Sequence, residues 1–206
     1  MTSKPFRFGV IILAAGASRR MGTPKQLLLV GGKPLVVRAA EAALGSSAWP
    51  VIVVVGAHAE KIRPPLAQLP VIIADNPAWA EGMAASIRVG IAMLQQFSRA
   101  IDAAVIALCD QPAFSSATLE KFVAAQRSST GSIVAARYHG RQGVPALFLR
   151  EHFPALGALT GEAGARALLN PVDAEQRKAI HAIDLSELGL DLDTPNDYQA
   201  MQAQQQ

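Results

Sequence analysis

The feature that most constrains this chain is an apolar run near its start, which ends in a loop with two glycines and several basic residues. The run from Val10 is rich in β-branched side chains, which is typical of a buried strand. Gly16 and Gly22 follow it, and a glycine lets backbone N–H groups approach a ligand where a Cβ would obstruct them. Arg20 and Lys25 place two cations of different shape in the same loop. The sequence therefore predicts a strand that leads into a loop for a chain of phosphates.

The spacing within this loop excludes two familiar phosphate-binding motifs. A P-loop needs Gly, four residues and then Gly-Lys-Ser/Thr, but Met21 stands where the second glycine belongs. The dinucleotide fingerprint G-x-G-x-x-G fails because Ser18 takes the place of its second glycine. The Gly-Gly-Lys-Pro stretch that ends at Pro34 is no P-loop either, since proline occupies the hydroxyl position. A strand followed by a merely solvated basic loop would explain the apolar run, but not both glycines and the lysine in register.

Composition limits the class of protein and its partners. With 206 residues, 50% of them hydrophobic, the chain can bury a substantial core, and we expect residues 1–206 to form one domain. Its net charge of +3 permits an anionic small molecule, but no cluster of Lys and Arg interleaved with aromatic residues predicts nucleic-acid binding. The single cysteine, Cys109, excludes a disulfide framework and favours a reducing cytoplasm.

The N-terminal segment imitates a secretory signal, because Lys4 and Arg7 precede an apolar stretch from Phe8 to Ala17. Cleavage there would destroy the glycine-containing loop, so we expect the stretch to remain as a strand. No apolar run approaches the ~18 residues of a membrane span, and we therefore predict a soluble protein with no membrane partner.

Strand-like and helix-like segments alternate along most of the chain. The strands expected after the first are Val51–Gly56, Val71–Ala74, Ala103–Cys109 and Ile180–Leu185, with a hairpin between residues 131 and 148. The expected helices are Leu35–Leu44, one that follows His58 and ends before Pro64, one that ends near Gln96, one that begins near Ser115 and a last one from Pro195. This order predicts an α/β sheet, mostly parallel, with a less regular second half that covers one side.

Asp110 follows an apolar strand directly and stands just before a proline. Ligands of open parallel sheets bind outside the carboxyl ends of the strands, where the loop of Gly16 also lies. A carboxylate there suits Mg²⁺, which takes one or two protein carboxylates and completes its shell with water and phosphate oxygens. Asp110 could instead cap the next helix, but Ser115 or Ser116 is better placed to do so.

Two further stretches carry candidate site residues. A turn before a helix would explain Gly82, yet the small residues between it and Ser86 also suit a surface where a flat base approaches the backbone. Near the end of the chain, Thr194 and the proline after it start a helix by themselves. They do not account for the alternating carboxylates Asp191 and Asp193.

The loop pattern Leu-Ala-Ala-Gly-x-x-x-Arg-Met-Gly-x-x-Lys resembles the signature of MobA-like nucleotidyltransferases, of the molybdenum-cofactor and sugar-nucleotide type. Stretches similar to the family's Asn-Pro-x-Trp-x-x-Gly-Met and Leu-Cys-Asp-Gln-Pro begin at Asn76 and Leu108, and similar segments occur from Val10 to Tyr198. The resemblance implies a Rossmann-like three-layer sandwich of the nucleotide-diphospho-sugar transferase type, a single MobA-like NTP transferase domain over residues 1–206. The chain departs from the family at Val144, where histidine is frequent.

The resemblance also implies roles for individual residues. Arg20 and Lys25 would be catalytic, and Asp193 would join Asp110 as a ligand of one Mg²⁺ that bridges a triphosphate. The nucleotide would contact residues of the first loop and of the stretch after Asn76, namely Leu13, Ala14, Ala15, Gly16, Gly82, Met83 and Ser86.

The chain shows no nucleophile with an adjacent base, because Cys109 lies inside a strand and no serine stands on a nucleophile elbow. The simplest chemistry is then in-line attack by a substrate phosphate on the α-phosphorus of a nucleoside triphosphate, with pyrophosphate leaving. Arg20 would hold the β- and γ-phosphates, and Lys25 would follow the charge that develops between the α- and β-phosphates.

Within the family the chain looks most like the molybdenum cofactor cytidylyltransferases, which join CMP from CTP to the terminal phosphate of molybdopterin. The Leu-Ala-Ala-Gly loop, where guanylyl enzymes usually show Leu-Ala-Gly-Gly, and the Asn-Pro-x-Trp stretch both favour cytidine. Guanylyl, sugar-1-phosphate and methylerythritol-phosphate nucleotidyltransferases are the alternatives within enzymes. A non-catalytic chaperone that hands molybdopterin to a client such as a molybdenum hydroxylase is another, but Lys25 and two acidic positions argue against a pure carrier.

Overall fold

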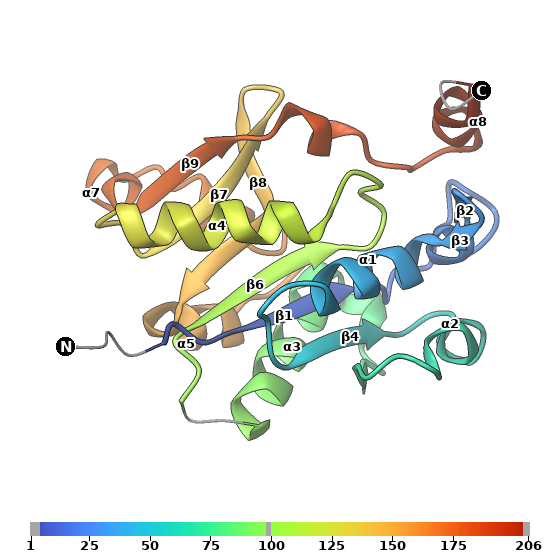
Figure 1. The fold of residues 1–206 in the computed structure, drawn as a ribbon, viewed down its shortest axis with the longest axis horizontal. Coiled ribbons are helices and arrows are strands. Elements are labelled where there is room, and N and C mark those ends of the chain that lie inside the picture. Colours follow the sequence, from blue (N-terminus) through green and yellow to red (C-terminus); the bar gives the residue numbers. More distant parts are fainter. Residues whose placement is uncertain (1–4, 98–99, 204–206) are drawn as a thin grey trace.

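A seven-stranded sheet forms the centre of the molecule (Figure 1). The structure is a computed structural model that describes residues 5–97 and 100–203. Across the sheet the strands lie in the order β5 (Ile72–Asp75), β4 (Val51–Val55), β1 (Phe8–Leu13), β6 (Ala103–Leu108), β8 (Arg141–Leu149), β7 (Ile133–Tyr138) and β9 (Ile180–Asp184).

The sheet is parallel except at one strand. β8 runs antiparallel to both of its neighbours, β6 and β7, whereas every other neighbouring pair is parallel. β7 and β8 form the hairpin that the sequence predicts, and the reversed direction of β8 follows from its tight turn. The prediction of a mostly parallel sheet is therefore confirmed.

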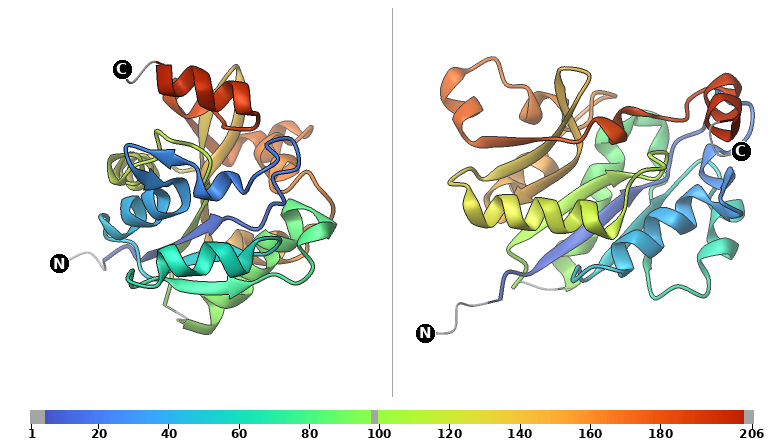
Figure 2. Two further views of the ribbon diagram at one scale, coloured as in Figure 1. Left: turned by 90° about the vertical axis from the view of Figure 1, so that its right-hand side faces the viewer. Right: turned by 45° about the horizontal axis from the view of Figure 1, so that its top comes forward.

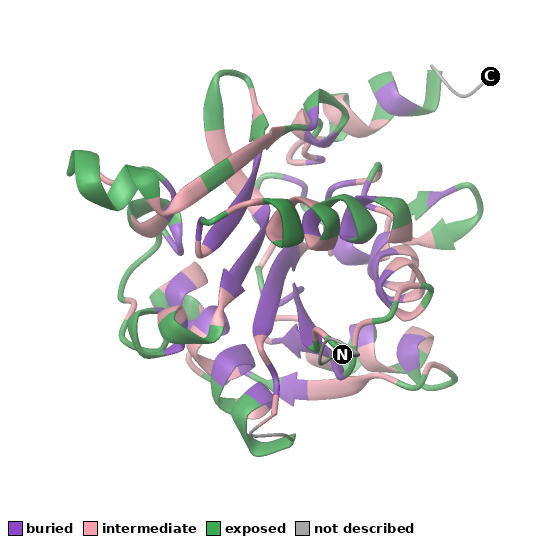
Figure 3. Ribbon diagram, turned by 60° about the vertical axis from the view of Figure 1, so that its left-hand side comes forward, coloured by how far each residue is buried: buried purple, intermediate pink, exposed green. Residues whose placement is uncertain are grey.

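Helices cover both faces of the sheet, because side chains of each buried strand alternate between two cores. In β1, Val10 and Ile12 point into one core, and Ile11 and Leu13 point into the other. The first core packs against α1 (Leu35–Leu44), α2 (Ala59–Leu66) and α4 (Ser116–Ser128). The second packs against α3 (Met83–Phe97), α5 (Phe153–Gly157) and α6 (Arg166–Leu169), and Figure 3 shows the buried strands between the helices. This arrangement is the predicted three-layer sandwich.

The strand order reverses beside β1. The chain moves from β1 to β4 and β5 on one side, and then crosses back to β6 on the other side. The loops that follow β1 and β6 therefore leave the sheet next to each other at its carboxyl edge. In open α/β sheets, ligands bind in the crevice at this kind of position.

The C-terminal segment returns to the beginning of the chain. From β9 it passes through the 3-10 turn η4 (Ser186–Gly189) to α8 (Pro195–Ala203). In Figures 1 and 2, α8 lies beside the small hairpin of β2 (Leu29–Val30) and β3 (Lys33–Pro34). Residues 190–194, between η4 and α8, thereby reach the loop that follows β1.

A small apolar cluster and one hydrogen bond fix α8 in this position. Leu192 and Met201 are buried in the cluster, which also contains Val30 of the hairpin. The hydroxyl of Tyr198 donates to the backbone oxygen of Leu29 at 2.8 Å. The C-terminal segment is thus docked on the N-terminal part of the chain, far from the strand that precedes it.

Local predictions were confirmed at the start of α4 and wrong at the end of α2. Ser115 caps α4 and forms a capping box with Thr118, so that Asp110 is free of this role. The prediction that the second helix ends before Pro64 is wrong, because α2 continues through Pro64 to Leu66. Proline cannot donate to the carbonyl four residues earlier, but those carbonyls belong to exposed residues where water can replace the donor, and the buried Leu66 holds the last turn in place.

Several short elements were not predicted. They include the helices α5 and α7 (Ala174–Lys178) and the 3-10 turns η1 (Lys25–Leu27), η2 (Trp79–Glu81), η3 (Arg150–His152) and η4. At the N-terminus, the stretch that imitates a secretory signal forms β1 between β4 and β6, while Lys4 lies outside the described residues. Among the helices of the described chain, none has both the length and the hydrophobicity that a membrane crossing needs.

α3 packs so closely on β1 that no side chain fits at Gly90. A Cβ at Gly90 would lie 2.4 Å from Cγ2 of the fully buried Ile11, whereas a Cβ at Gly157, also in a helix, would meet nothing within 4 Å. We expect Gly90→Ala to lower the free energy of unfolding by about 1–3 kcal/mol, the usual cost of overpacking. Gly157→Ala should leave it unchanged or raise it by up to about 1 kcal/mol. Urea denaturation of both variants checks this, and equal stabilities would contradict the close approach.

Candidate active site

The loop that follows β1 is held in shape by a buried glutamine, Gln26. Its side-chain nitrogen donates to the backbone oxygens of Ala14 at 3.0 Å and Gly16 at 2.7 Å. Its side-chain oxygen accepts from the hydroxyl of Ser18 at 3.2 Å, and that hydroxyl accepts from the backbone N–H of Lys25 at 3.1 Å. Ser18 itself adopts the left-handed conformation, with φ of 52°. One glutamine therefore closes the loop on itself.

Gln26 was not predicted as a functional residue. A polar residue between a lysine and an apolar segment is a weak signal, because it is equally common on a surface. Its importance is apparent only from its burial, since 1% of the residue is exposed.

The two loop glycines serve different purposes. Gly22 has a φ of +72°, which only glycine adopts without strain. Gly16 has no positive φ, and a Cβ built on it would meet no heavy atom within 4 Å. The packing of the protein therefore gives no reason for a glycine at position 16, and close approach of a ligand stays the prediction for it.

A cavity of about 400 Å³ opens beside this loop at the carboxyl edge of β1 and β6. Gln26, Trp79 and Glu162 contribute to its wall. The lining also contains every residue predicted to contact the nucleotide, together with one predicted catalytic residue and one predicted metal ligand: Leu13, Ala14, Ala15, Gly16, Gly82, Met83, Ser86, Lys25 and Asp110. The structure thus brings three distant stretches of the sequence to one cavity.

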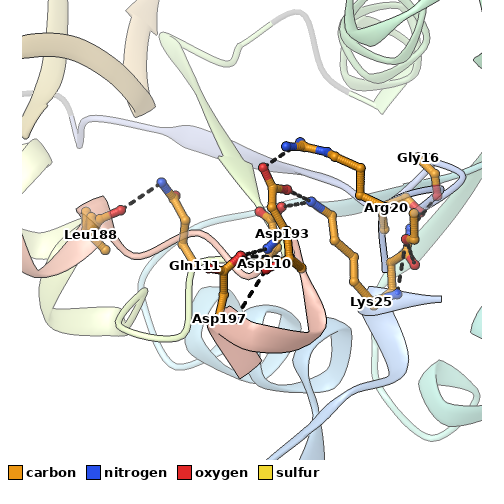
Figure 4. Close-up of polar contacts among 12 residues, drawn as sticks. Gly16, Arg20, Lys25, Asp110, Gln111, Leu188, Asp193 and Asp197 are labelled. Atoms are coloured by element: carbon orange, nitrogen blue, oxygen red, sulfur yellow. Dashed lines mark hydrogen bonds and ion pairs between the residues drawn. The ribbon is translucent and has the colours of Figure 1, made fainter. Parts of the chain in front are cut away.

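Lys25 lies between the two carboxylates that were predicted to bind a metal (Figure 4). Its ammonium contacts Oδ2 of Asp110 directly and lies 2.8 Å from Oδ1 of Asp193. The other oxygen of Asp193 accepts from Nη2 of Arg20 at 2.6 Å. Four residues from three separate stretches of the sequence therefore form one cluster.

Charge interactions within the cluster are strong enough to shift ionisation. Burial would lower the pKa of Lys25, but its contacts with Asp110 and Asp193 outweigh burial and raise this pKa above its ordinary value. Burial would raise the pKa of Asp193, but the hydrogen bond and charge of Lys25, together with Arg20, lower it. The pair of Lys25 and Asp193 therefore stays charged near neutral pH.

Asp191 differs from these residues. Burial, and the nearby charges of Asp110 and Asp193, raise the pKa of Asp191 to about 6. One of its side-chain oxygens is buried without a hydrogen-bond partner among the described residues. Asp191 faces a second cavity, described below, and no role was predicted for it.

The donor set of the cluster fits a hard divalent cation. Oδ1 of Asp110 is buried and has no hydrogen-bond partner in the described chain, so one carboxylate oxygen is available. Within residues 5–97 and 100–203, no group of three or more His, Cys, Asp and Glu side chains is placed to hold a metal. Two carboxylates are what Mg²⁺ uses when substrate phosphates complete its shell. Asp110 and Asp193 would be the protein ligands.

The stretch after β5 is tied to the other half of the molecule through Gly82. This residue has a φ of +108°, and a Cβ there would lie 2.7 Å from Cα of Glu162 and 2.8 Å from the oxygen of Gly161. Ser86, further along, accepts a hydrogen bond from the side chain of the buried Asn76 at 3.0 Å. The positive φ and the close packing against Gly161 and Glu162 therefore explain the glycine at position 82 without any ligand. Contact of Gly82 with a base stays a prediction.

A second cavity of about 880 Å³ adjoins the first. Met83 and Glu162 line both cavities and form their common wall. The remainder of the lining comes from the turn of the β7–β8 hairpin, from residues 163–170 and from Asp191. It includes Arg141 and Arg166, whose guanidinium groups make no hydrogen bond or ion pair with another described residue.

Gln111 joins the hairpin wall of the second cavity to the C-terminal segment. Its side-chain nitrogen donates to the backbone oxygen of Val144 on β8 at 3.1 Å. It also donates to the backbone oxygen of Leu188 in η4 at 3.1 Å (Figure 4). It is buried and directly follows Asp110 in the chain. The sequence motif contained this glutamine, but only the fold shows that it joins the hairpin to the C-terminal segment.

The sheet and these cavities define the class of the protein: a Rossmann-like α/β protein with a cavity at the carboxyl edge of the sheet, where the strand order reverses and open α/β sheets commonly bind ligands. The family model of the MobA-like NTP transferase domain matches residues 10–179. The chain therefore belongs to the family of MobA-like NTP transferase domains.

Two relatives are similar to this chain over almost their whole length. The chain is 32% identical over 195 residues to the nicotine blue oxidoreductase of Paenarthrobacter nicotinovorans, with 89% of this chain and 91% of the relative covered. It is 31% identical over 205 residues to the purine catabolism protein PucB of Bacillus subtilis (strain 168), with 94% and 95% covered.

A solved structure is similar over almost its whole length. Rv0371c from Mycobacterium tuberculosis H37Rv has a TM-score of 0.79 and 28% identity, covering 96% of this chain and 98% of that chain. Its complex with manganese has a TM-score of 0.74 and 24% identity, covering 95% and 97%. The predicted family and the predicted fold type are both confirmed.

The role of Gln26 can be tested by removing its amide. We expect Gln26→Leu to weaken binding of a nucleoside triphosphate by at least about tenfold, because unpaired carbonyls at 14 and 16 cost about 1–3 kcal/mol each and the loop loses its shape. Calorimetric titration of CTP with Mg²⁺ measures this. Gln126→Leu is the matched control, since Gln126 also donates one side-chain hydrogen bond to a backbone oxygen, that of Gly131 at 2.9 Å, away from both cavities. Wild-type affinity in Gln26→Leu would contradict the role.

Proposed function

We propose that this protein transfers CMP from CTP to the terminal phosphate of molybdopterin and releases pyrophosphate. The observation that carries the proposal is the convergence of Lys25, Asp110 and Asp193 beside the Gly16 loop. Family membership supports nucleotidyl transfer as the reaction class. The choice of cytidine and of molybdopterin rests on the resemblance of the loop and of the Asn-Pro-x-Trp stretch.

The first cavity would hold the nucleotide. Its base and ribose would lie between the backbone of Ala14 to Gly16 and the segment from Gly82 to Ser86, since both segments line the cavity. Its phosphates would extend toward Arg20 and Lys25. Arg20 is suited to this task because 72% of its side chain is exposed, so it can leave Asp193 for a phosphate.

The chemistry would be direct displacement at the α-phosphorus. The acceptor phosphate forms the new P–O bond, and the bond to the β-phosphate breaks as pyrophosphate leaves. Lys25 stabilises negative charge on the bridging oxygen, which grows toward the transition state. A divalent metal, when bound by Asp110 and Asp193, would neutralise phosphate charge, and the manganese complex of Rv0371c supports a metal in this family.

A covalent enzyme intermediate is not favoured by the side chains at hand. Cys109 lines the first cavity but is buried, and burial raises the pKa of its thiol well above the ordinary value. A thiol in this state is a poor nucleophile. Direct attack by the acceptor therefore remains the simpler route.

The second cavity would hold the acceptor. Its free cations, Arg141 and Arg166, suit an anionic molecule, and its volume exceeds that of the first cavity. The common wall at Met83 and Glu162 would place the reacting phosphates of both substrates near the cluster of Lys25. Because Arg20 and Asp193 complete one site from opposite ends of the chain, we propose that residues 1–206 act as a single domain. We also propose that this domain works in the cytoplasm, because the single cysteine, Cys109, favours a reducing compartment. A molybdenum hydroxylase would be the client.

The metal role is tested by Asp110→Asn, which keeps the volume of the side chain but removes its charge. We expect Mg²⁺-dependent pyrophosphate release to fall by more than about tenfold, which is ~1.4 kcal/mol of barrier, while the circular dichroism spectrum shows an intact fold. Asp75→Asn is a suitable control because Asp75 also stands at the carboxyl end of a strand, yet it is exposed and pairs with Arg63 outside the cavities. A smaller loss in Asp110→Asn than tenfold would show that Asp110 is no metal ligand.

The base preference is tested by measuring pyrophosphate release with each nucleoside triphosphate, with and without molybdenum cofactor. We expect CTP to be preferred over GTP, because the side chains at Ala14 and Ala15 narrow the cavity for a purine. Ala15→Gly should broaden the preference without inverting it, since one methyl group in a pocket is worth about 1–3 kcal/mol. Productive transfer of GMP with tighter binding of GTP by the wild type would overturn the cytidylyl assignment and favour the guanylyl alternative. Binding of the cofactor without pyrophosphate release would favour the chaperone.

A further inference from the structure

The contacts of Lys25 and Arg20 occupy most of the oxygen atoms that a metal would need. Asp110 and Asp193 have four side-chain oxygens between them. Oδ2 of Asp110 and Oδ1 of Asp193 contact Lys25, and Oδ2 of Asp193 accepts from Arg20. Only Oδ1 of Asp110 has no described partner. The protein's own cations therefore already neutralise the predicted metal site.

An ammonium group and a divalent cation cannot share this position. Mg²⁺ binds oxygen at about 2.0–2.1 Å, so a metal that bridges both carboxylates would sit where the ammonium of Lys25 now lies. The site is also partly shielded from water, with 19% of the Lys25 side chain and 8% of the Asp110 side chain exposed. At such a site opposite charges attract more strongly than in water, and Lys25 competes effectively for the carboxylates.

A triphosphate offers Lys25 another partner. Lys25 lines the same cavity as the Gly16 loop, so its flexible side chain can turn from the carboxylates toward phosphates without leaving that cavity. A metal that arrives with the triphosphate replaces Lys25 on the carboxylates, while the phosphates replace the carboxylates around Lys25. A metal that arrives alone gains the carboxylates but leaves an ammonium beside it with no counter-charge.

We propose that Lys25 is an internal counter-ion that excludes free metal from Asp110 and Asp193 and yields this position only to a metal bound to a triphosphate. The inference rests on the proposed function for the identity of the site. It names the metal–triphosphate complex, and not the separate ion, as the form of the substrate that the protein binds. It also gives Lys25 a second task, in addition to stabilising charge on the bridging oxygen.

The test measures Mn²⁺ binding by the electron paramagnetic resonance signal of the free ion, first without nucleotide. Coupling between two groups in a protein commonly changes the affinity for a ligand by about 5–150-fold. We therefore expect Lys25→Met to bind Mn²⁺ at least about tenfold more tightly than the wild type. Lys25→Gln, which keeps a polar side chain, should show the same direction if Lys25→Met folds poorly. Lys33→Met is the matched control because Lys33 pairs with Glu41 at 2.7 Å outside both cavities, and it should bind Mn²⁺ as the wild type does.

Two further measurements locate the effect. The double variant Lys25→Met with Asp110→Asn should lose the gain in Mn²⁺ affinity, because the gain comes from that carboxylate. With a saturating α,β-methylene analogue of CTP, the advantage of Lys25→Met should disappear, because Lys25 of the wild type has then moved to the phosphates. Lys25 variants that bind Mn²⁺ no more tightly than the wild type without nucleotide, or a gain that survives the loss of Asp110, would overturn the proposal.

The outcome is separable from that of the proposed function. The nucleotide-free comparison needs no transfer reaction, so it stands even if CTP and molybdopterin prove to be the wrong substrates. Conversely, normal pyrophosphate release by the wild type together with unchanged Mn²⁺ affinity in Lys25→Met would overturn the counter-ion role and leave the proposed reaction intact.

Discussion

The ionic contact between Lys25 and two distant carboxylates is the interaction on which the site depends. Asp110 is delivered by the end of β6, whereas Asp193 belongs to the segment that returns from β9 to dock on the N-terminal hairpin. Without the lysine, two partly buried carboxylates would face each other, together with Asp191, and their mutual repulsion would oppose this return. A buried ion pair is weak evidence for stability in itself, since desolvation offsets much of the attraction. Its role here is geometric, because it holds three segments of the chain together at one point.

Much of the fold could be predicted from the sequence. The buried strands are continuous apolar runs, and α1 is bounded by a proline and a glycine, so its predicted range Leu35–Leu44 coincides with the observed helix. The prediction for α2 was too short because proline was taken as a stop signal. In the structure, the burial of Ile62 and Leu66 outweighs the low helix propensity of proline. Tertiary context decided the outcome there.

The site was predictable only where a residue carries chemistry by its own type. Arg20, Lys25, Asp110 and Asp193 have charges that point to phosphate and metal, and the resemblance placed them in one motif set. Gln26 and Gln111 act through backbone oxygens that lie 10 and 12 residues away or 33 and 77 residues away, respectively. Such partners have no sequence pattern, because a backbone oxygen is present at every position. The second cavity was also beyond prediction, since its walls come from segments that meet only in the folded chain.

The common wall of the two cavities has a consequence for how the reaction ends. A product in which nucleotide and acceptor are joined would occupy both cavities across Met83 and Glu162. Each half would then keep the other at a high effective concentration, so that partial release of one end is followed by rebinding more often than by escape. Such bivalent retention would make departure of the product slow unless a second macromolecule binds one half of the product. A tightly kept product, delivered only on contact with its recipient, would protect a labile compound from the surrounding solvent.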